Sequence, residues 1–393
     1  MPNDKSKHNL REEQTMQFLR TERTHRAIRR ALLATTIVAF AGPALAQEPF
    51  DLNALIEAAR KEPPITVYDS TGKIVEMAKA FAEKYGVGAE GSKVKATAQL
   101  EMIIREARAN NIQGDVSIIS DAPAAMAQLI PQGFAESWLP PDLAANIPTE
   151  YQDPLTVVTS ANVWAYNTEL FDKCPVSNIW QLTGPEWKGK VAMQDPLGKP
   201  SYVDWFNQMA KHGDDKVAAA YKELYGKDLE TDDGSATAAW VKALAANAPL
   251  LTDADAAAAD AVGAPGQSQP FMGLMSSAKF RDNAEKGMKL GLCKDLKPWL
   301  GWMYPGVGLI TKGTNSPNAS KLFIHYVMTA EGIAPQAEDG KMSTNKDVSL
   351  PADEPSGIGA VLDQVMPYQM ATSLDDWDAR ETWQDLWRLS YQK

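Results

Sequence analysis

The chain has 393 residues and a net charge of −11 at neutral pH. The first 46 residues carry eight Lys or Arg and four Asp or Glu, so the remaining 347 carry a net charge of −15. An acidic surface repels phosphate backbones and anionic lipid, which argues against nucleic acid as a partner and against docking on a membrane surface. A segment of 347 residues exceeds one ordinary core and predicts two lobes.

The segment that ends at Ala46 has the order of an export signal. Three arginines within 26–30 precede an uncharged, largely apolar stretch over 31–41, and a Gly-Pro break and an Ala-Leu-Ala site follow. The apolar stretch is shorter than the roughly 20 residues that span a bilayer. We therefore expect residues 1–46 to be a signal peptide, cleaved after Ala46, and the mature protein to be soluble in the periplasm.

The chain after the signal alternates strand and helix patterns. β-Branched and aromatic residues at 65–68 predict a strand, and the apolar spacing over 74–85 predicts a helix that ends at Gly86. The next expected elements are a strand at 93–96, a helix over 100–107 and a strand at 115–119. This alternation predicts an α/β protein with mainly parallel sheets flanked by helices.

A second series of strands and helices follows in the middle of the chain. Short strands are expected at 162–167 and 190–193, and the helical patterns that come next cover 205–211, 217–225 and 236–246. Strand patterns return at 288–292 and 307–310, and the chain is mostly helical from 318 onward.

Motifs for catalysis or metal binding are weak. The chain has no G-x-S-x-G, H-E-x-x-H or C-x-x-C motif and no glycine-rich phosphate loop in a suitable context. His212 and His325 lie in helical patterns and have no metal-ligating residue four positions on. We therefore expect no catalytic residue, no metal and no cofactor. Cys174 and Cys293 would be exported together, but their spacing leaves open whether they form a disulfide.

Binding features are stronger, because ligands of open α/β sheets sit where strands lead into helices. The loop with Asp69, Ser70 and Thr71 offers hydroxyls at a helix start, and Lys199 and Ser201 open a later helix. Free N–H groups at a helix start suit an oxyanion. Ordinary helix capping is the alternative interpretation of each loop.

Aromatic residues near the expected strand ends form a second group of candidates, since their rings can stack on a ligand or cover a cation. Core packing explains any single one of them equally well. The complete set of candidate ligand-binding residues is Asp69, Ser70, Thr71, Gln99, Ser120, Asp121, Lys199, Ser201, Tyr202, Trp205, Asp253, Trp302 and Tyr304.

The chain resembles a known family in several places that follow one another in the expected order. The similar segments are 52–59, 65–68, 80–86, 114–116, 164–171, 185–192 and 318–323. Together they resemble the extracellular solute-binding proteins of ABC importers, in the branch that includes periplasmic ferric-ion-binding proteins. The resemblance covers nearly all of 50–345 and implies a two-lobed type II periplasmic-binding fold with a ligand cleft between the lobes.

One departure from that branch concerns the ligand. Its iron-binding members carry an adjacent Tyr-Tyr pair in the second lobe, and no Tyr-Tyr occurs in this chain. Phenolates are the hard anionic donors that a ferric site needs, so ferric binding is disfavoured. Other members of the branch resemble carriers of phosphorylated sugars, phosphonates and thiamine, which leaves the solute open.

We interpret the chain as the monomeric receptor of an ABC importer, which delivers a small polar solute to an inner-membrane permease and is not an enzyme. The expected division is a signal peptide at 1–46, lobe one at 47–162 and 306–393, and lobe two at 163–305. An anionic solute of the phosphate, phosphonate or carboxylate type is slightly favoured. The alternatives are an organic cation such as a polyamine or a thiamine-like solute, ferric ion, and a secreted hydrolase that uses Asp69 or Asp121.

Overall fold

The computed structural model describes residues 50–391, so the expected signal peptide lies outside the described residues. The main helices are α2 (Leu52–Ala59), α3 (Ile74–Tyr85), α4 (Ala96–Arg108), α5 (Ala122–Ala124), α6 (Pro200–His212), α7 (Asp214–Tyr225), α8 (Ala236–Ala246), α9 (Asp255–Gly263), α10 (Asp282–Lys286), α11 (Pro317–Val327), α12 (Ala330–Ala337) and α13 (Ser373–Ser390). The strands are β1 (Ile65–Asp69), β2 (Ala89–Lys93), β3 (Val116–Ile119), β4 (Ala135–Glu136), β5 (Thr156–Asn167), β6 (Val191–Gln194), β7 (Leu250–Thr252), β8 (Met272–Ser276), β9 (Leu290–Leu292), β10 (Gly301–Thr311), β11 (Met342–Ser343) and β12 (Val365–Met366).

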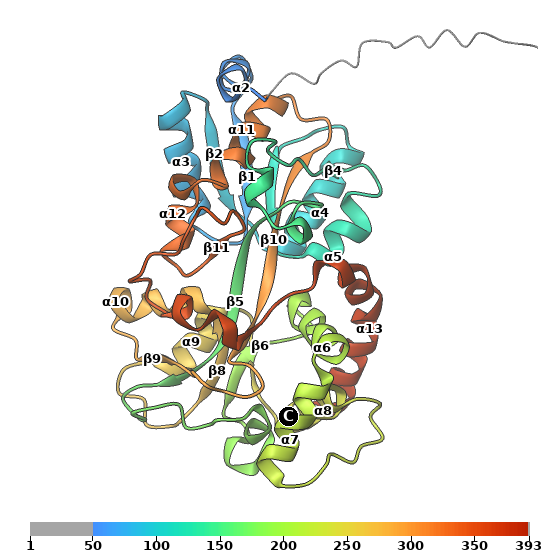
Figure 1. Ribbon diagram of the computed structural model, residues 1–393, viewed down its shortest axis with the longest axis vertical. Coiled ribbons are helices and arrows are strands. Elements are labelled where there is room, and N and C mark those ends of the chain that lie inside the picture. The colour runs from blue at the N-terminus through green and yellow to red at the C-terminus, as the bar shows by residue number, and fades with distance from the viewer. Residues whose placement is uncertain (1–49, 392–393) are drawn as a thin grey trace, which may run out of the picture. The chain divides into compact units, whose positions relative to one another are not determined.

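Two long strands join two similar sets of parallel strands into one sheet. The strand order is β2-β1-β3-β10-β5-β8-β6-β7. Strands β2, β1 and β3 are parallel to one another, as are β8, β6 and β7. Strands β5 and β10 run antiparallel through the middle, where Figure 1 shows them in green and orange. The sheet confirms the predicted α/β class with mainly parallel strands flanked by helices.

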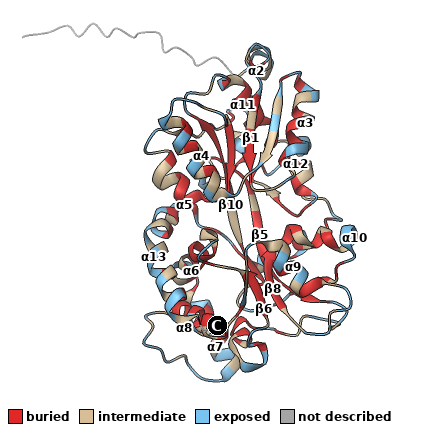
Figure 2. Ribbon diagram, turned by 180° about the vertical axis from the view of Figure 1, so that it is seen from behind, coloured by how far each residue is buried: buried red, intermediate tan, exposed pale blue. Residues whose placement is uncertain are grey.

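The hydrophobic core is divided between the two ends of the long strands. One cluster, around β1, α3 and α11, includes Phe81 and Phe323, and a smaller one lies beside it around β3 and α5. The third cluster, around β6, β8, α6 and α8, includes Trp164 and Trp240. We call the part built on β1–β3 the first half and the part built on β6–β8 the second half. Figure 2 shows the buried strands in red between helices whose outer faces are exposed.

Most of the predicted elements are present, but one strand lies at a different position and two strands are longer than predicted. The strand predicted at 93–96 is wrong in position, since β2 covers Ala89–Lys93 and Ala96 already begins α4. The strands predicted at 162–167 and 307–310 are the end portions of the longer β5 and β10. Both strands are buried along most of their length, so no alternation of apolar and polar residues marks their full extent.

The last helix returns to the second half of the molecule. Helix α13 packs against α6 and α8, and it also contacts α5 of the first half. Its Trp383 and Trp387 belong to the core cluster around α6 and α8. The C-terminal segment, which the sequence analysis assigned to lobe one, therefore contributes to both cores.

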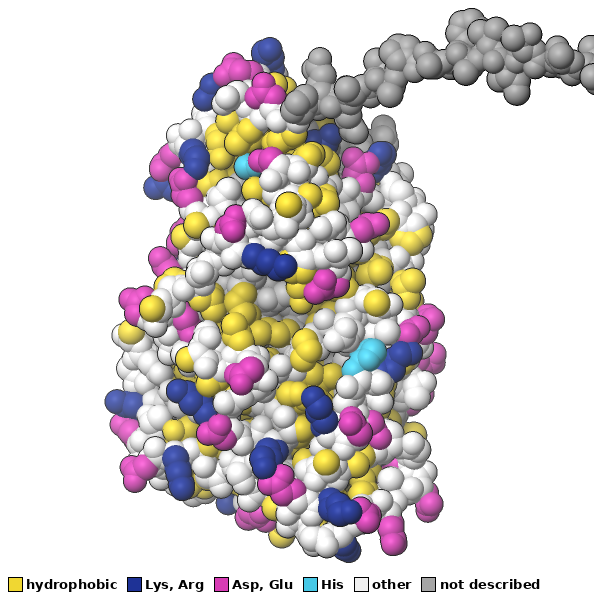
Figure 3. Space-filling model, in the orientation of Figure 1, with side chains coloured by type: hydrophobic (Ala, Val, Ile, Leu, Met, Phe, Trp, Pro, Cys, Tyr) yellow, Lys and Arg dark blue, Asp and Glu magenta, His cyan; other side chains and the backbone are white. Residues whose placement is uncertain are grey.

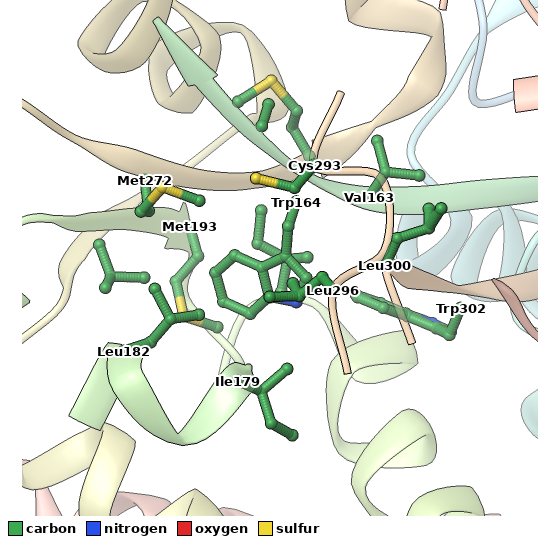
Figure 4. Packing of buried hydrophobic residues seen from close by; sticks show 14 of the residues in the cluster. Val163, Trp164, Ile179, Leu182, Met193, Met272, Cys293, Leu296, Leu300 and Trp302 are labelled. Carbon is green, nitrogen blue, oxygen red and sulfur yellow. The ribbon is translucent and has the colours of Figure 1, made fainter. Parts of the chain in front are cut away.

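A disulfide bond links two distant parts of the chain within the second half. Cys174 and Cys293 are bonded, with Cα atoms 5.0 Å apart. Cys293 lies next to Trp164, whose indole Figure 4 shows among the side chains of Leu182, Met193 and Leu296. The structure thus resolves the question that the cysteine spacing left open.

Among residues 50–391, no helix has the length and apolar character that crossing a membrane requires.

We predict that replacing both cysteines with alanine lowers the free energy of unfolding by about 2–5 kcal/mol, because the bond joins positions 119 residues apart and restricts the unfolded chain. Urea unfolding of the two proteins measures the difference, and wild-type protein unfolded in the presence of a reductant is the control. Identical midpoints for the oxidised wild type and the double variant would contradict the prediction.

Candidate functional site

The carboxyl end of β1 carries the first group of predicted site residues. Asp69 is buried, and its carboxylate accepts hydrogen bonds from Gln336 Nε2 at 2.8 Å and from the backbone N–H of Thr71 at 3.2 Å. The hydroxyl of Ser70 also lies 3.4 Å from this carboxylate. Burial raises the pKa of Asp69, and the positive charge of Lys341 opposes that shift in part. The loop is thus polar, ordered by its own hydrogen bonds and partly accessible at Ser70 and Thr71.

The starts of α6 and α9 meet beside the central strands. Lys199 precedes α6 and Asp255 begins α9, and their charged atoms are 3.3 Å apart. Lys199 Nζ also lies 3.4 Å from the side-chain oxygen of Asn162 and 4.8 Å from the ring centre of Tyr202. Burial lowers the pKa of Lys199, while the Asp255 charge opposes that shift. A cation is therefore held where two helices begin.

Neither of these helix starts is capped by a side chain. No side-chain hydrogen bond reaches the first N–H groups of α6 or of α9. The first N–H groups of a helix have no partner within the helix and carry its positive dipole end. Helix α6 opens with Pro200, which has no N–H, and the Tyr202 N–H already bonds to the backbone oxygen of Lys199. The further donors between Lys199 and Asp255 are therefore the N–H groups of Ser201 and of the first two residues of α9.

The central strands place polar side chains next to Lys199. In the sheet register, Asn162 of β5 is paired with Ser276 of β8, and Ser160 of β5 is paired with Tyr304 of β10. Residues 160 and 162 share one face of β5, because side chains alternate along a strand. We call Ser160, Asn162, Lys199, Asp255, Ser276 and Tyr304 the central polar cluster.

Tyr304 lies within electrostatic reach of both halves. Burial raises its pKa, and the negative charges of Asp255 in the second half and Asp69 in the first half raise it further. The hydroxyls of Ser276 and Ser160 act in the opposite direction. The phenol therefore remains protonated at neutral pH and is a hydrogen-bond donor between the two halves.

Asn162 has an unused donor at the centre of this cluster. The residue is fully buried, and its side-chain nitrogen has no hydrogen-bond partner among the described residues. A buried polar group without a partner is costly, so such groups are rare and need an explanation. A bound solute that accepts a hydrogen bond here would supply one.

The predicted aromatic residues lie behind the cluster, in the core. Trp205 and Trp302 are stacked with ring centres 4.1 Å apart, and the edge of Tyr202 meets Trp302 at 5.1 Å. All three side chains are buried, and the Tyr202 hydroxyl donates to the backbone oxygen of Leu274. They pack against one another and so support the strands from the core side. Tyr304, the fourth aromatic candidate, is partly exposed.

Four other predicted residues have different surroundings. Asp121 is buried and bonded to Arg380. Gln99 is buried and donates to the backbone oxygen of Val94 at 2.8 Å. Ser120 and Ser201 are partly buried beside the ends of β3 and α6. Within residues 50–391, no hydrogen bond joins Gln99 to the central polar cluster.

Asp253 is the one exposed member of the predicted set, and its backbone oxygen accepts a hydrogen bond from Gln194 Nε2 at 3.2 Å. Its neighbour Asp255 reaches Lys199 instead, because Asp255 is at the first position of α9.

Sequence reasoning missed Asn162, Ser160 and Ser276. An asparagine and two serines inside buried strands are unusual there, since strand interiors favour β-branched and aromatic residues. That signal was present for Asn162, which lies in a predicted strand. For Ser276 no signal was available, because β8 itself was not predicted.

The space-filling view shows where the molecule is hollowed. Figure 3 shows a depression across the middle of one face, lined largely by hydrophobic side chains and bordered above by a basic one. Within residues 50–391, no group of three or more His, Cys, Asp or Glu side chains is arranged to hold a metal ion.

Comparison with known proteins identifies the family. The model of the family described as "bacterial extracellular solute-binding protein" matches residues 65–340. No curated protein matches the chain in sequence.

Three solved structures illustrate the likeness. Iron-bound HitA from Pseudomonas aeruginosa is 17% identical, with 82% of this chain and 99% of that chain covered and a TM-score of 0.62. AfuA from Actinobacillus pleuropneumoniae, solved with fructose-6-phosphate, is 20% identical, with 83% and 99% covered and a TM-score of 0.60. A substrate-binding protein of an ABC transporter from Agrobacterium tumefaciens is 14% identical, with 86% and 97% covered and a TM-score of 0.64.

At these identities the likeness establishes the fold, which is the predicted two-lobed type II periplasmic-binding fold. The family match covers well over half of the chain, and this chain therefore belongs to the bacterial extracellular solute-binding proteins.

Proposed function

We propose that this solute-binding protein is the periplasmic receptor of an ABC importer and that it carries a small polar solute with an anionic group. We favour an anion because Lys199 lies where α6 and α9 begin, and neither helix start is capped by a side chain. Ammonium and free N–H groups together form the kind of site that holds phosphate or carboxylate oxygens.

The other members of the central polar cluster fit the same ligand. Asn162 and Tyr304 offer donors, and the hydroxyls of Ser160 and Ser276 can donate or accept. Asp255 balances the charge of Lys199 and can accept hydrogen bonds from hydroxyl groups of a solute. A phosphorylated or carboxylated polyol would use both kinds of partner, and a sugar phosphate is the ligand named for the AfuA structure.

An organic cation is supported less well. Its recognition would need ring faces and free carboxylates, but Trp205 and Trp302 are buried against each other and Asp121 is bonded to Arg380. Asp69 and Asp255 remain as acceptors. Ferric ion is the other alternative, and HitA was solved with iron bound, but this chain has no adjacent tyrosine pair to supply phenolates.

A secreted hydrolase on the same scaffold is the alternative from another class. Its candidate residues were Asp69 and Asp121. Three hydrogen bonds from the protein already reach the carboxylate of Asp69, and Asp121 is bonded to Arg380. A receptor returns its solute unchanged, whereas a hydrolase converts it, so turnover separates the two functions.

We further propose that the two halves are lobes that close on the solute. The long strands cross between them, and β10 contains Pro305 and Gly306 followed by a register shift against β5. An irregular pairing at this point lets the strands bend without breaking the parallel sets on either side. Closure gives the permease a shape that it can distinguish from the open form.

Native mass spectrometry of mature protein purified from periplasm tests the receptor function. We expect one small molecule bound per chain, released chemically unchanged, and a smaller radius in solution scattering with the solute than without it. Conversion of the bound molecule would contradict a receptor. Superimposable scattering curves for solute-bound and solute-free protein would contradict closure.

We predict that Lys199→Met weakens binding of the anionic solute about ten- to a hundredfold, because one charged hydrogen bond contributes roughly 1.5–3 kcal/mol. Titration calorimetry with the solute identified by mass spectrometry measures the change. Lys222→Met is the matched control, since Lys222 is an exposed lysine on α7. Equal affinities for the two variants, both folded by circular dichroism, would remove Lys199 from the site.

A further inference from the structure

The C-terminal helix lies outside the part of the chain that matches the family. The match ends at residue 340, and α13 covers Ser373–Ser390. Its Trp387 side chain is almost fully buried, stacks near Phe206 of α6 and belongs to the core of the second half. The helix is thus an integral part of the fold that lies beyond the matched segment.

Polar contacts also fix α13 to the second half. Asp376 is fully buried, and its carboxylate accepts hydrogen bonds of 2.7 Å from Gln208 and Asn207 of α6. The Tyr368 hydroxyl, just before the helix, donates to the same carboxylate at 2.7 Å. One face of α13 is therefore attached firmly to α6.

One turn further on, Arg380 joins the two halves. Its guanidinium donates two hydrogen bonds of 2.8 Å to the two oxygens of Asp204, which lies on α6 of the second half. The same group donates to both oxygens of Asp121, which ends the loop after β3 in the first half and caps α5. The arginine side chain is 11% exposed and the two carboxylates 4–5%.

The charges explain why this position requires an arginine. Without the guanidinium, two carboxylates would lie buried and close together, which is strongly unfavourable. Burial raises the pKa of Asp204, which is about 7 even though Arg380 opposes the shift more than any other group. Only a planar cation with several donors can satisfy both carboxylates at once.

We propose that α13 is a clamp between the lobes, in which Arg380 carries the bond to Asp121 that must break when the lobes separate. In this role Arg380 also neutralises Asp121, the carboxylate after β3 that a positively charged solute would otherwise use. The inference rests on the lobe movement proposed above. In the solute-free protein, α13 therefore favours the arrangement of the two lobes in which Arg380 is bonded to Asp121.

A second bridge exists on the other side of the central strands. Arg281 of the second half is bonded to Asp339, which follows α12 in the first half. Arg281 is more exposed than Arg380, at 26% against 11%, so water competes more effectively for its hydrogen bonds. None of the variants below changes Arg281 or Asp339.

The experiment measures solution scattering of the full mature chain without solute. Arg380→Met is expected to give a larger radius of gyration than the wild type. Arg388→Met is the matched control, because Arg388 lies on the same helix, is exposed and pairs only with Asp385 of that helix among the salt bridges of the described residues. It is expected to leave the radius unchanged.

A second variant separates the loss of the bridge from an effect of misfolding. Since Arg380→Met leaves two buried carboxylates without a cation, the triple variant Asp121→Asn, Asp204→Asn and Arg380→Met removes these charges while it still removes the bridge. We expect it to fold by circular dichroism and to have the larger radius as well. Folded variants whose scattering superimposes on that of the wild type would overturn the clamp.

Chemical rescue tests the bond itself. Millimolar ethylguanidinium is expected to raise the melting temperature of Arg380→Ala, whose truncated side chain leaves room for it beside the two carboxylates, and to return the radius of this variant toward the wild-type value, without affecting Arg388→Ala. No selective effect would overturn the role of the guanidinium. If the wild type closes on its solute while the Arg380 variants keep the wild-type radius, the clamp alone fails; if the wild type does not close, the proposed lobe movement fails.

Discussion

The pairing of β5 with β10 is the constraint on which the rest of the structure depends. These strands contribute Val157 and Ile310 to the core of the first half, and Val163 and Trp302 to the core of the second. The two sets of parallel strands are attached to opposite ends of this pair, so the carboxyl ends of both sets point toward its middle. The polar side chains of the middle therefore face loops from both halves, which is how a site forms between them.

Burial of charge in this region is tolerated because each charge has a partner. Lys199 is paired with Asp255, and Arg380 with Asp121 and Asp204. A buried pair adds little stability compared with apolar residues of the same shape, but loss of one member is costly. Such pairs therefore fix geometry more than they stabilise the fold. Around the cleft they determine which carboxylates are already satisfied and which donors remain for a solute.

The sequence was sufficient for the class of fold, because helix spacing and short β-rich segments such as 65–68 depend on local residues. It was insufficient for strands that form only because they pair with segments distant in the sequence. Strand β2 has the polar sequence Ala-Glu-Gly-Ser-Lys and exists because it pairs with β1 at the edge of the sheet. Strand β8 is buried on both faces, so its residues show no alternation, and a short buried run cannot be told from a helix by its pattern.

At the candidate site, too, local sequence predicted some features, whereas contacts between distant residues determined others. The rule that ligands lie where strands lead into helices selected Asp69, which ends β1, and Lys199, which precedes α6, but it could not say which side chains already have partners in the fold. Asp69 ends β1 and Asp121 lies two residues after β3, yet the partner of Asp121, Arg380, lies 259 positions away in the chain. Bonds over such separations leave no local pattern in the sequence. Which carboxylates at the candidate site already have a cationic partner is therefore a property of the folded chain, and the C-terminal helix contributes to it through Arg380.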